Sequence, residues 1–136
     1  LTVAENIRVQ IDTAALSNTE KTKAVDRALA YVEMTEKANV SGAELNTFER
    51  RLTDIAKCIV GAPKLIMFDE PAGGLSVQET KTLGDLILGI HDHTGAHVLL
   101  IDHDVDAEVF HRGVEILFDV FGDSVNLVDE ENVAFL

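Results

Sequence analysis

Residues 64–71 read KLIMFDEP, an unbroken apolar run that ends abruptly in two carboxylates, Asp69 and Glu70. The run does not alternate between apolar and polar residues, which is typical of a strand covered on both faces, as in parallel sheets. Residues 97–101, which read HVLLI, form a second run of this kind. The sequence therefore predicts two buried strands of one parallel sheet.

A helix is expected between these strands. Residues 77–91 follow a Gly73-Gly74 loop and carry apolar residues at helical spacing, namely Leu83, Leu86, Ile87 and Ile90. Strand, helix and strand in this order predict an α/β fold with a right-handed βαβ unit and parallel strands. Since ligands gather at the carboxyl ends of parallel strands, five residues should share one edge: Asp69, Glu70, Asp102, His103 and Asp104.

The residues before this unit predict helices over 1–9, 20–37 and 48–59. Ser17 or Thr19 can cap the second helix, whose apolar stripe is Ala24, Ala28, Tyr31 and Val32. The third helix should face inward with Leu52, Ile55, Ala56 and Ile59 and end at residues 61–63. A turn-prone stretch at 39–42 predicts a helical subdomain over 1–45, followed by a second part over 46–136. In that part a short helix at 105–110 and a hairpin over 114–128 are expected.

Composition predicts one ordinary soluble domain. The 136 residues are 46% hydrophobic and carry a net charge of −13, which disfavours direct binding to nucleic acid or to anionic lipid. The apolar runs are much shorter than the roughly 20 residues of a membrane span, so no direct membrane insertion is expected. The single cysteine, Cys58, is interpreted as a small residue on a buried helix face in a reducing compartment.

The predicted sheet edge suits phosphoryl chemistry. One carboxylate can hold Mg²⁺ while its neighbour orients the attacking water, and a histidine from the next strand can donate a hydrogen bond to the γ-phosphate. The competing interpretation is that Asp69 and Glu70 cap the following turn and that His103 is an ordinary surface histidine.

Several stretches together resemble the ATP-binding domains of ABC transporters. Residues 65–71 resemble the Walker B motif, 72–76 follow as the D-loop does, and His103 with Asp104 is similar to the switch-histidine motif. Two further stretches resemble the segment that opens the helical subdomain and the helix behind the signature motif, namely 1–7 and 50–57. The wording of 69–75 most resembles importers of the branched-chain amino-acid type, and the resemblance covers about residues 1–108.

This resemblance implies a cofactor, partners and residue roles. Asp69 would hold Mg²⁺, Glu70 would orient or deprotonate the lytic water, and His103 would contact the γ-phosphate of ATP. Gly74, Leu75 and Ser76 would contribute to nucleotide binding through the D-loop. The implied partners are a transmembrane permease and a second ATPase subunit, with the chain at the cytoplasmic face of the membrane.

The sequence also departs from the family pattern. Neither the phosphate loop G-x-x-x-x-G-K-[ST] nor the glutamine loop is present, so the chain resembles the later half of the domain, as a piece of a longer protein or a degenerate relative. The signature position reads LNTFE over residues 45–49, without glycine, and Ser76 stands at the D-loop aspartate. Two interpretations stay open for Asn46, Thr47, Phe48 and Glu49: an altered nucleotide-binding motif, or a helix N-cap.

Alternatives remain for a histidine cluster and for the whole chain. His91, His93 and His97 with Asp92 could suggest a metal site, but we expect their side chains to diverge and the helix dipole to explain the histidines. A second functional hypothesis is a non-catalytic module that binds a partner protein through its helical subdomain. A DNA-repair or chromosome-type ABC protein is disfavoured by the charge.

Overall fold

The computed structural model describes residues 1–101. The expected helix at 105–110, the hairpin over 114–128 and the residues Asp102, His103 and Asp104 lie outside the described residues. The chain divides into two compact units, one from Leu1 to Pro63 and a second that begins at Lys64. Each unit is described by itself below.

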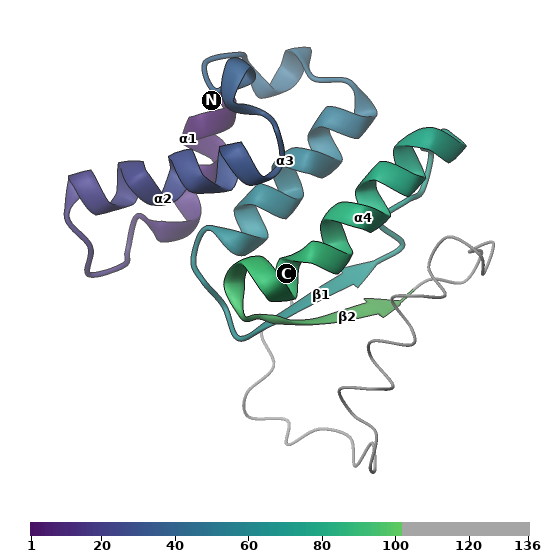
Figure 1. The fold of residues 1–136 in the computed structure, drawn as a ribbon. Coiled ribbons are helices and arrows are strands. Elements are labelled where there is room, and N and C mark those ends of the chain that lie inside the picture. The colour runs from purple at the N-terminus through teal and green to yellow at the C-terminus, as the bar shows by residue number, and fades with distance from the viewer. Residues whose placement is uncertain (102–136) are drawn as a thin grey trace, which may run out of the picture. The chain divides into compact units, whose positions relative to one another are not determined.

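The first unit is helical (Figure 1). Its elements are α1 (Val3–Arg8), α2 (Asn18–Tyr31) and α3 (Thr47–Ile59), with short 3₁₀ turns at Val9–Ile11, Thr35–Lys37 and Gly42–Glu44. The three α-helices contact one another in every pairing. Their buried side chains form one apolar core: Val3, Ile7, Ala24, Val25, Ala28, Leu29, Leu52, Ile55, Ala56 and Ile59. The predicted inward face of α3 is therefore confirmed.

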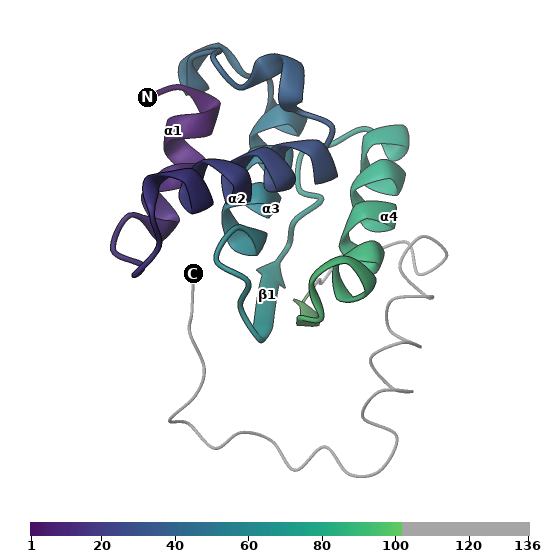
Figure 2. The same cartoon turned by 60° about the vertical axis from the view of Figure 1, so that its left-hand side comes forward.

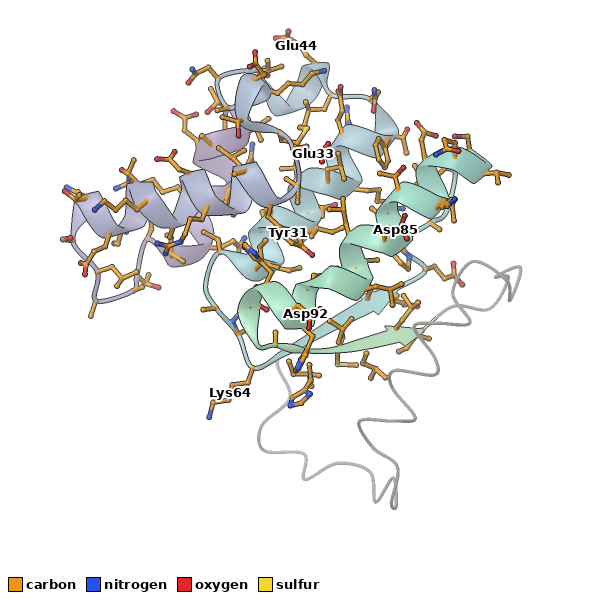
Figure 3. The ribbon with its side chains drawn as sticks, in the orientation of Figure 1. Tyr31, Glu33, Glu44, Lys64, Asp85 and Asp92 are labelled. Carbon is orange, nitrogen blue, oxygen red and sulfur yellow. The ribbon has the colours of Figure 1, made fainter. Side chains whose placement is uncertain are left out.

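Helix α2 ends earlier than its apolar spacing predicts. It begins after Ser17, whose hydroxyl accepts a hydrogen bond from the Glu20 N–H, so Ser17 rather than Thr19 is the cap. It ends at Tyr31 instead of continuing to residue 37, because Glu33 adopts a left-handed φ of 57°. The Glu33 N–H then donates to the Ala30 carbonyl and the Met34 N–H to the Leu29 carbonyl, which is a Schellman ending. Figure 3 labels Glu33 at this turn.

The first predicted helix is also shorter at both ends. Leu1 and Val9, which the spacing placed on its apolar stripe, are exposed, while Val3, Ile7 and Ile11 are buried. The Thr2 side chain caps α1, so Leu1 lies before the helix. Val9 begins the 3₁₀ turn, in which the helical spacing changes.

The second unit has the predicted strand–helix–strand order, with β1, α4 and β2 labelled in Figure 1 and with β1 and α4 seen from another side in Figure 2. Strand β1 (Leu65–Asp69) and strand β2 (His97–Ile101) are parallel, with Leu65 opposite His97 and Asp69 opposite Ile101. Between them α4 (Val77–Thr94) buries Leu83, Ile87 and Ile90, and it contacts β2. The helix ends at Gly95, whose φ of +76° is a backbone conformation that glycine adopts without strain. The α/β fold class is confirmed.

Burial of the strands differs from the expectation. Ile66 and Phe68 are buried, but Leu65 and Met67 on the opposite face keep partial exposure. In the part of the chain that the structure describes, β1 is therefore buried on one face only. The unit boundary differs as well: the sequence pattern placed it after residue 45, whereas the first compact unit includes α3 and reaches Pro63. Of the helices that the structure describes, none combines the length and apolar character that a membrane span needs.

Candidate functional site

The two carboxylates of the predicted Walker B motif lie at the carboxyl end of β1. Asp69 is the last residue of the strand, and Glu70 follows it with a left-handed φ of 45°. The Glu70 N–H donates to the Ile101 carbonyl at 2.8 Å, which continues the hydrogen bonding between β1 and β2 by one residue. Both residues are exposed. The sheet therefore presents two adjacent carboxylates at the edge where parallel strands place ligand-binding groups.

A compact turn leads from these carboxylates into α4. The Gly73 N–H donates to the Glu70 carbonyl at 3.3 Å, and the Leu75 N–H donates to the Ala72 carbonyl at 3.1 Å. Gly74, with a φ of +80°, has no heavy atom near the position of a Cβ. The turn between Glu70 and the start of α4 is thus closed by backbone hydrogen bonds.

Ser76 is the N-cap of α4. The Glu79 N–H donates to the Ser76 hydroxyl at 3.4 Å, and the Ser76 N–H donates to a Glu79 carboxylate oxygen at 2.8 Å. The same hydroxyl hydrogen-bonds to that carboxylate and lowers the pKa of Glu79. The residue at the D-loop aspartate position therefore has a structural role here. Contact of Gly74, Leu75 or Ser76 with a nucleotide remains a prediction.

The donor set at the end of β1 fits a nucleotide-bound magnesium ion. Mg²⁺ in such sites takes one or two protein carboxylates and completes its shell with phosphate oxygens and water. Among residues 1–101, no group of three or more His, Cys, Asp or Glu side chains is arranged to hold a metal ion. Asp69 thus has the chemistry to share a magnesium ion with bound phosphate, and a cage made by protein side chains alone is not found in this part of the chain.

The signature position lies in the first unit, at the N-terminus of α3. The Glu49 N–H donates to Asn46 Oδ1 at 2.9 Å, and the Asn46 N–H donates to Glu49 Oε2 at 3.1 Å. These reciprocal bonds are a capping box, and they confirm that Asn46 rather than Thr47 caps the helix. Whether Asn46, Thr47, Phe48 and Glu49 also contact a nucleotide stays a prediction.

Lys37 is a residue of this site that the sequence pattern did not indicate. Its ammonium forms an ion pair with Glu49 Oε1. This hydrogen bond is the largest cause of a lowered pKa of Glu49, and the Asn46 backbone adds to it. The negative charge expected at the signature position is therefore partly offset. No periodicity connects residues 37 and 49, so only the folded structure could reveal the pair.

Arg50 links α3 to the segment before it, while the hydrogen bond of Thr53 lies within the helix. Arg50 donates to the Leu45 carbonyl at 3.0 Å and to the Ala43 carbonyl at 3.4 Å, and the Thr53 hydroxyl donates to the Glu49 carbonyl at 2.8 Å. Beside them is an open cavity of about 430 Å³ within the first unit, whose polar lining includes Asn6, Arg50, Thr53 and Lys57. The sequence pattern did not indicate this cavity.

Cys58 lies on the same helix and is half-buried. Burial raises the pKa of its thiol, and the Asp54 carboxylate adds to the rise. A thiol that stays protonated is a weak nucleophile. The sequence pattern placed Cys58 on a buried helix face, whereas in the structure the residue keeps partial exposure.

The histidines at the end of α4 correct one expectation. The rings of His91 and His97 lie 5.6 Å apart between centroids, so these two side chains converge instead of diverging. The turn at Gly95 reverses the chain direction, and it returns β2 alongside the last turn of α4. His91 and His93 do lie in that last turn, where the helix dipole favours basic groups.

Comparison with known proteins supports the resemblance found in the sequence. No family model matches the chain. It is 37% identical over 120 residues to the high-affinity branched-chain amino acid transport ATP-binding protein LivG of Escherichia coli K12, covering 77% of this chain and 47% of that protein. BraF of Pseudomonas aeruginosa, of the same description, is 34% identical with the same coverage. The chain thus spans about half the length of these curated relatives.

Solved structures give the same result for the fold. An ATP-binding cassette of an ABC transporter superposes with a TM-score of 0.70 and 19% sequence identity, over 78% of this chain and 47% of that one. Identity this low supports the fold alone. The sequence matches and the shared fold together make this chain a homologue of the ATP-binding proteins of ABC transporters, with branched-chain amino-acid transport proteins among its relatives.

Proposed function

We propose that the chain is part of an ATP-binding and ATP-hydrolysing subunit of an ABC-type importer for amino acids or related small polar solutes. The single observation that carries this proposal is the pair Asp69 and Glu70 at the carboxyl end of β1, in a chain homologous to such subunits. The subunit would work at the cytoplasmic face, bound to a transmembrane permease through its helical subdomain and paired with a second ATPase subunit.

The two carboxylates have different tasks in this proposal. Asp69, the last residue of the strand, would hold Mg²⁺, which when bound neutralises charge on the phosphates of ATP. Glu70 is held one residue further by its backbone bond to Ile101, and its carboxylate would orient the attacking water and accept its proton. His103, which lies outside the described residues, would donate to the γ-phosphate. A phosphate loop would have to come from outside residues 1–136, because their sequence contains none.

A mutational experiment separates these roles. Residues 1–136 are joined to the first half of a relative such as LivG, so that a phosphate loop is present, and ATP binding and phosphate release are measured. Glu70→Gln should lower turnover at least about a hundredfold with ATP binding retained, because the amide keeps the size but accepts no proton. Asp69→Asn should instead weaken Mg²⁺-dependent ATP binding. Equal effects of both changes on binding and turnover would contradict this division of roles.

The second candidate function is a non-catalytic module that binds a partner protein through its helical subdomain. It is favoured by the signature position, where Glu49 is engaged by Lys37 and by the capping box and where glycine is absent. The same experiment discriminates the two. If the joined chain binds MgATP but releases no phosphate even with Glu70 intact, the result supports the non-catalytic module and contradicts the proposed ATP hydrolysis.

A further inference from the structure

A pair of histidines in the second unit has no part in the function proposed above. His91 lies in the last turn of α4 and His97 is the first residue of β2. Both are exposed, and their ring centroids are 5.6 Å apart with a tilt of 34° between the planes. Two imidazoles that share one metal ion at about 2.0–2.1 Å from each ligand nitrogen have centroids roughly 5–6 Å apart. The observed separation of the ring centroids is therefore within the range for two imidazoles that share one metal ion.

The hydrogen bond of His91 selects the tautomer that a metal needs. His91 Nδ1 lies 3.0 Å from the Ala96 carbonyl oxygen. A carbonyl only accepts, so in the neutral ring the proton is on Nδ1, and Nε2 has its lone pair available. Metal-binding histidines commonly donate their second ring N–H to a backbone carbonyl in this way, which fixes both tautomer and ring direction.

The backbone around the pair is held by several hydrogen bonds. The Gly95 N–H donates to the His91 carbonyl at 2.7 Å, and the Ala96 N–H donates to the Thr94 hydroxyl at 3.0 Å. The His97 N–H donates to the Lys64 carbonyl at 2.8 Å, next to β1. The turn that brings the two rings together is thus built into the fold of the second unit, and little ordering of the chain would be required on binding.

We propose that His91 and His97 form a two-histidine site for a divalent transition-metal ion such as Cu²⁺, Ni²⁺ or Zn²⁺, with water completing the shell. Imidazole suits this class of ion, and Cu²⁺ binds nitrogen ligands most tightly within it. The site joins the end of α4 to the start of β2. It is distinct from the carboxylates, because His97 pairs with Leu65 at one end of the sheet and Asp69 lies about 13 Å away at the other.

The residues next to the two histidines bear on how tightly the pair can bind a metal ion. Asp92 and His93 follow His91 on α4, and Lys64 precedes β1 beside His97; Figure 3 labels Asp92 and Lys64. No third His, Cys, Asp or Glu joins the pair in a ligand group within residues 1–101. We therefore expect an accessible site of moderate affinity, which differs from a closed structural metal centre.

The test titrates Cu²⁺ into the full chain of 136 residues, with calorimetry for affinity and electron paramagnetic resonance for coordinated nitrogens. The wild type should bind one Cu²⁺ at this site through two imidazole nitrogens. His91→Asn and His97→Asn should each weaken this binding at least about tenfold and reduce the coordinated imidazoles to one. His93→Asn is the matched control from the same helical turn, and it should change the affinity by less than about twofold.

Two results would overturn the proposal. One is unchanged Cu²⁺ affinity in both His91→Asn and His97→Asn. The other is a loss in His93→Asn, or in the double variant His103→Asn/His111→Asn, as large as the loss in the pair. Circular dichroism without metal checks that each variant is folded, and His97→Gln is a second variant in case His97→Asn is not.

Discussion

At the scale of single residues, two glutamates have a left-handed φ, and they lie in different structural settings. Glu33 has a φ of 57° because it is the residue after the C-cap of α2, where a Schellman ending requires this conformation. Glu70 has a φ of 45° where the chain leaves β1 and enters the turn before α4, although its N–H still donates to the Ile101 carbonyl. A left-handed φ costs a non-glycine residue about 1–2 kcal/mol in either place. Strain at Glu70 therefore supports a functional role only together with the adjacent Asp69 and the sheet edge.

The ion pair of Lys37 with Glu49 makes the stability of the first unit depend on pH. The Lys37 hydrogen bond holds the pKa of Glu49 below its usual value, so folding favours the ionised carboxylate. This contribution is complete above the unfolded-state value of about 4.3 and is lost as the pH falls through the lower folded-state pKa. Lys37→Met should raise the pKa of Glu49 and reduce stability at neutral pH by about 0.2–1 kcal/mol, the usual range for an ion pair near the surface.

This prediction is checked by following the Glu49 carboxyl carbon in an NMR titration and by urea unfolding at two pH values. Lys37→Arg is the control, since it keeps the positive charge and should keep the pKa of Glu49 low. If Glu49 titrates at the same pH in the wild type and in Lys37→Met, the ion pair does not form in solution.

At the scale of elements, the N-terminus of α3 supports a sharper test. The capping box between Asn46 and Glu49 satisfies two backbone N–H groups that would otherwise lack a partner in the helix. Asn46→Ala removes the acceptor for the Glu49 N–H and should lower the free energy of unfolding by about 1 kcal/mol. Urea denaturation followed by circular dichroism measures the change. Asn46→Asp retains a capping oxygen and should stay near the wild type; equal stability of the Ala and Asp variants would show that the cap contributes nothing.

The elements that could be predicted from the sequence are those whose signals are local. The apolar spacing of α3 and the residues at 61–63 that end it predicted its bounds closely, and the two apolar runs predicted β1 and β2. The end of α2 was wrong because the left-handed residue there is Glu33, and glycine or asparagine would have been needed as a signal. The ion pair of Lys37 with Glu49 and the convergence of His91 with His97 depend on the folded chain, which no spacing rule describes.

The candidate site was predictable to a similar extent. Placing Asp69 and Glu70 at the carboxyl end of a parallel strand needed only the pattern of 64–71 and the rule for such sheets. The hydrogen bond from Glu70 to Ile101 was not predictable from local spacing, because Ile101 comes 31 residues later in the sequence, on another strand. The capping role of Asn46 was one of two open interpretations, and the geometry confirms the cap without testing nucleotide contact.

At the scale of the whole molecule, the charge is distributed unevenly along the chain. Residues 64–136 contain 15 of the 24 acidic residues and 3 of the 11 basic ones, whereas residues 1–63 are nearly balanced. The carboxylates proposed to serve ATP therefore belong to the strongly acidic part of the sequence. Such a negative charge repels a nucleoside triphosphate unless cations or backbone N–H groups offset it. In P-loop proteins that offset comes from the phosphate loop and its lysine, which residues 1–136 do not contain.

We therefore expect residues 1–136, taken alone, to bind MgATP weakly, with a dissociation constant of about 1 mM or higher, which corresponds to about −4 kcal/mol or less favourable. Asp69 and Glu70 can hold a magnesium ion, but they cannot replace donors to the β- and γ-phosphates. Titration calorimetry with MgATP measures this, and the chain joined to the first half of a relative is the control, which should bind far more tightly. A micromolar dissociation constant for residues 1–136, about −8 kcal/mol, would mean that they contain a phosphate site of another kind. The cation-lined cavity of the first unit, with Arg50 and Lys57, would then be the first place to mutate, because it brings two basic side chains to one opening.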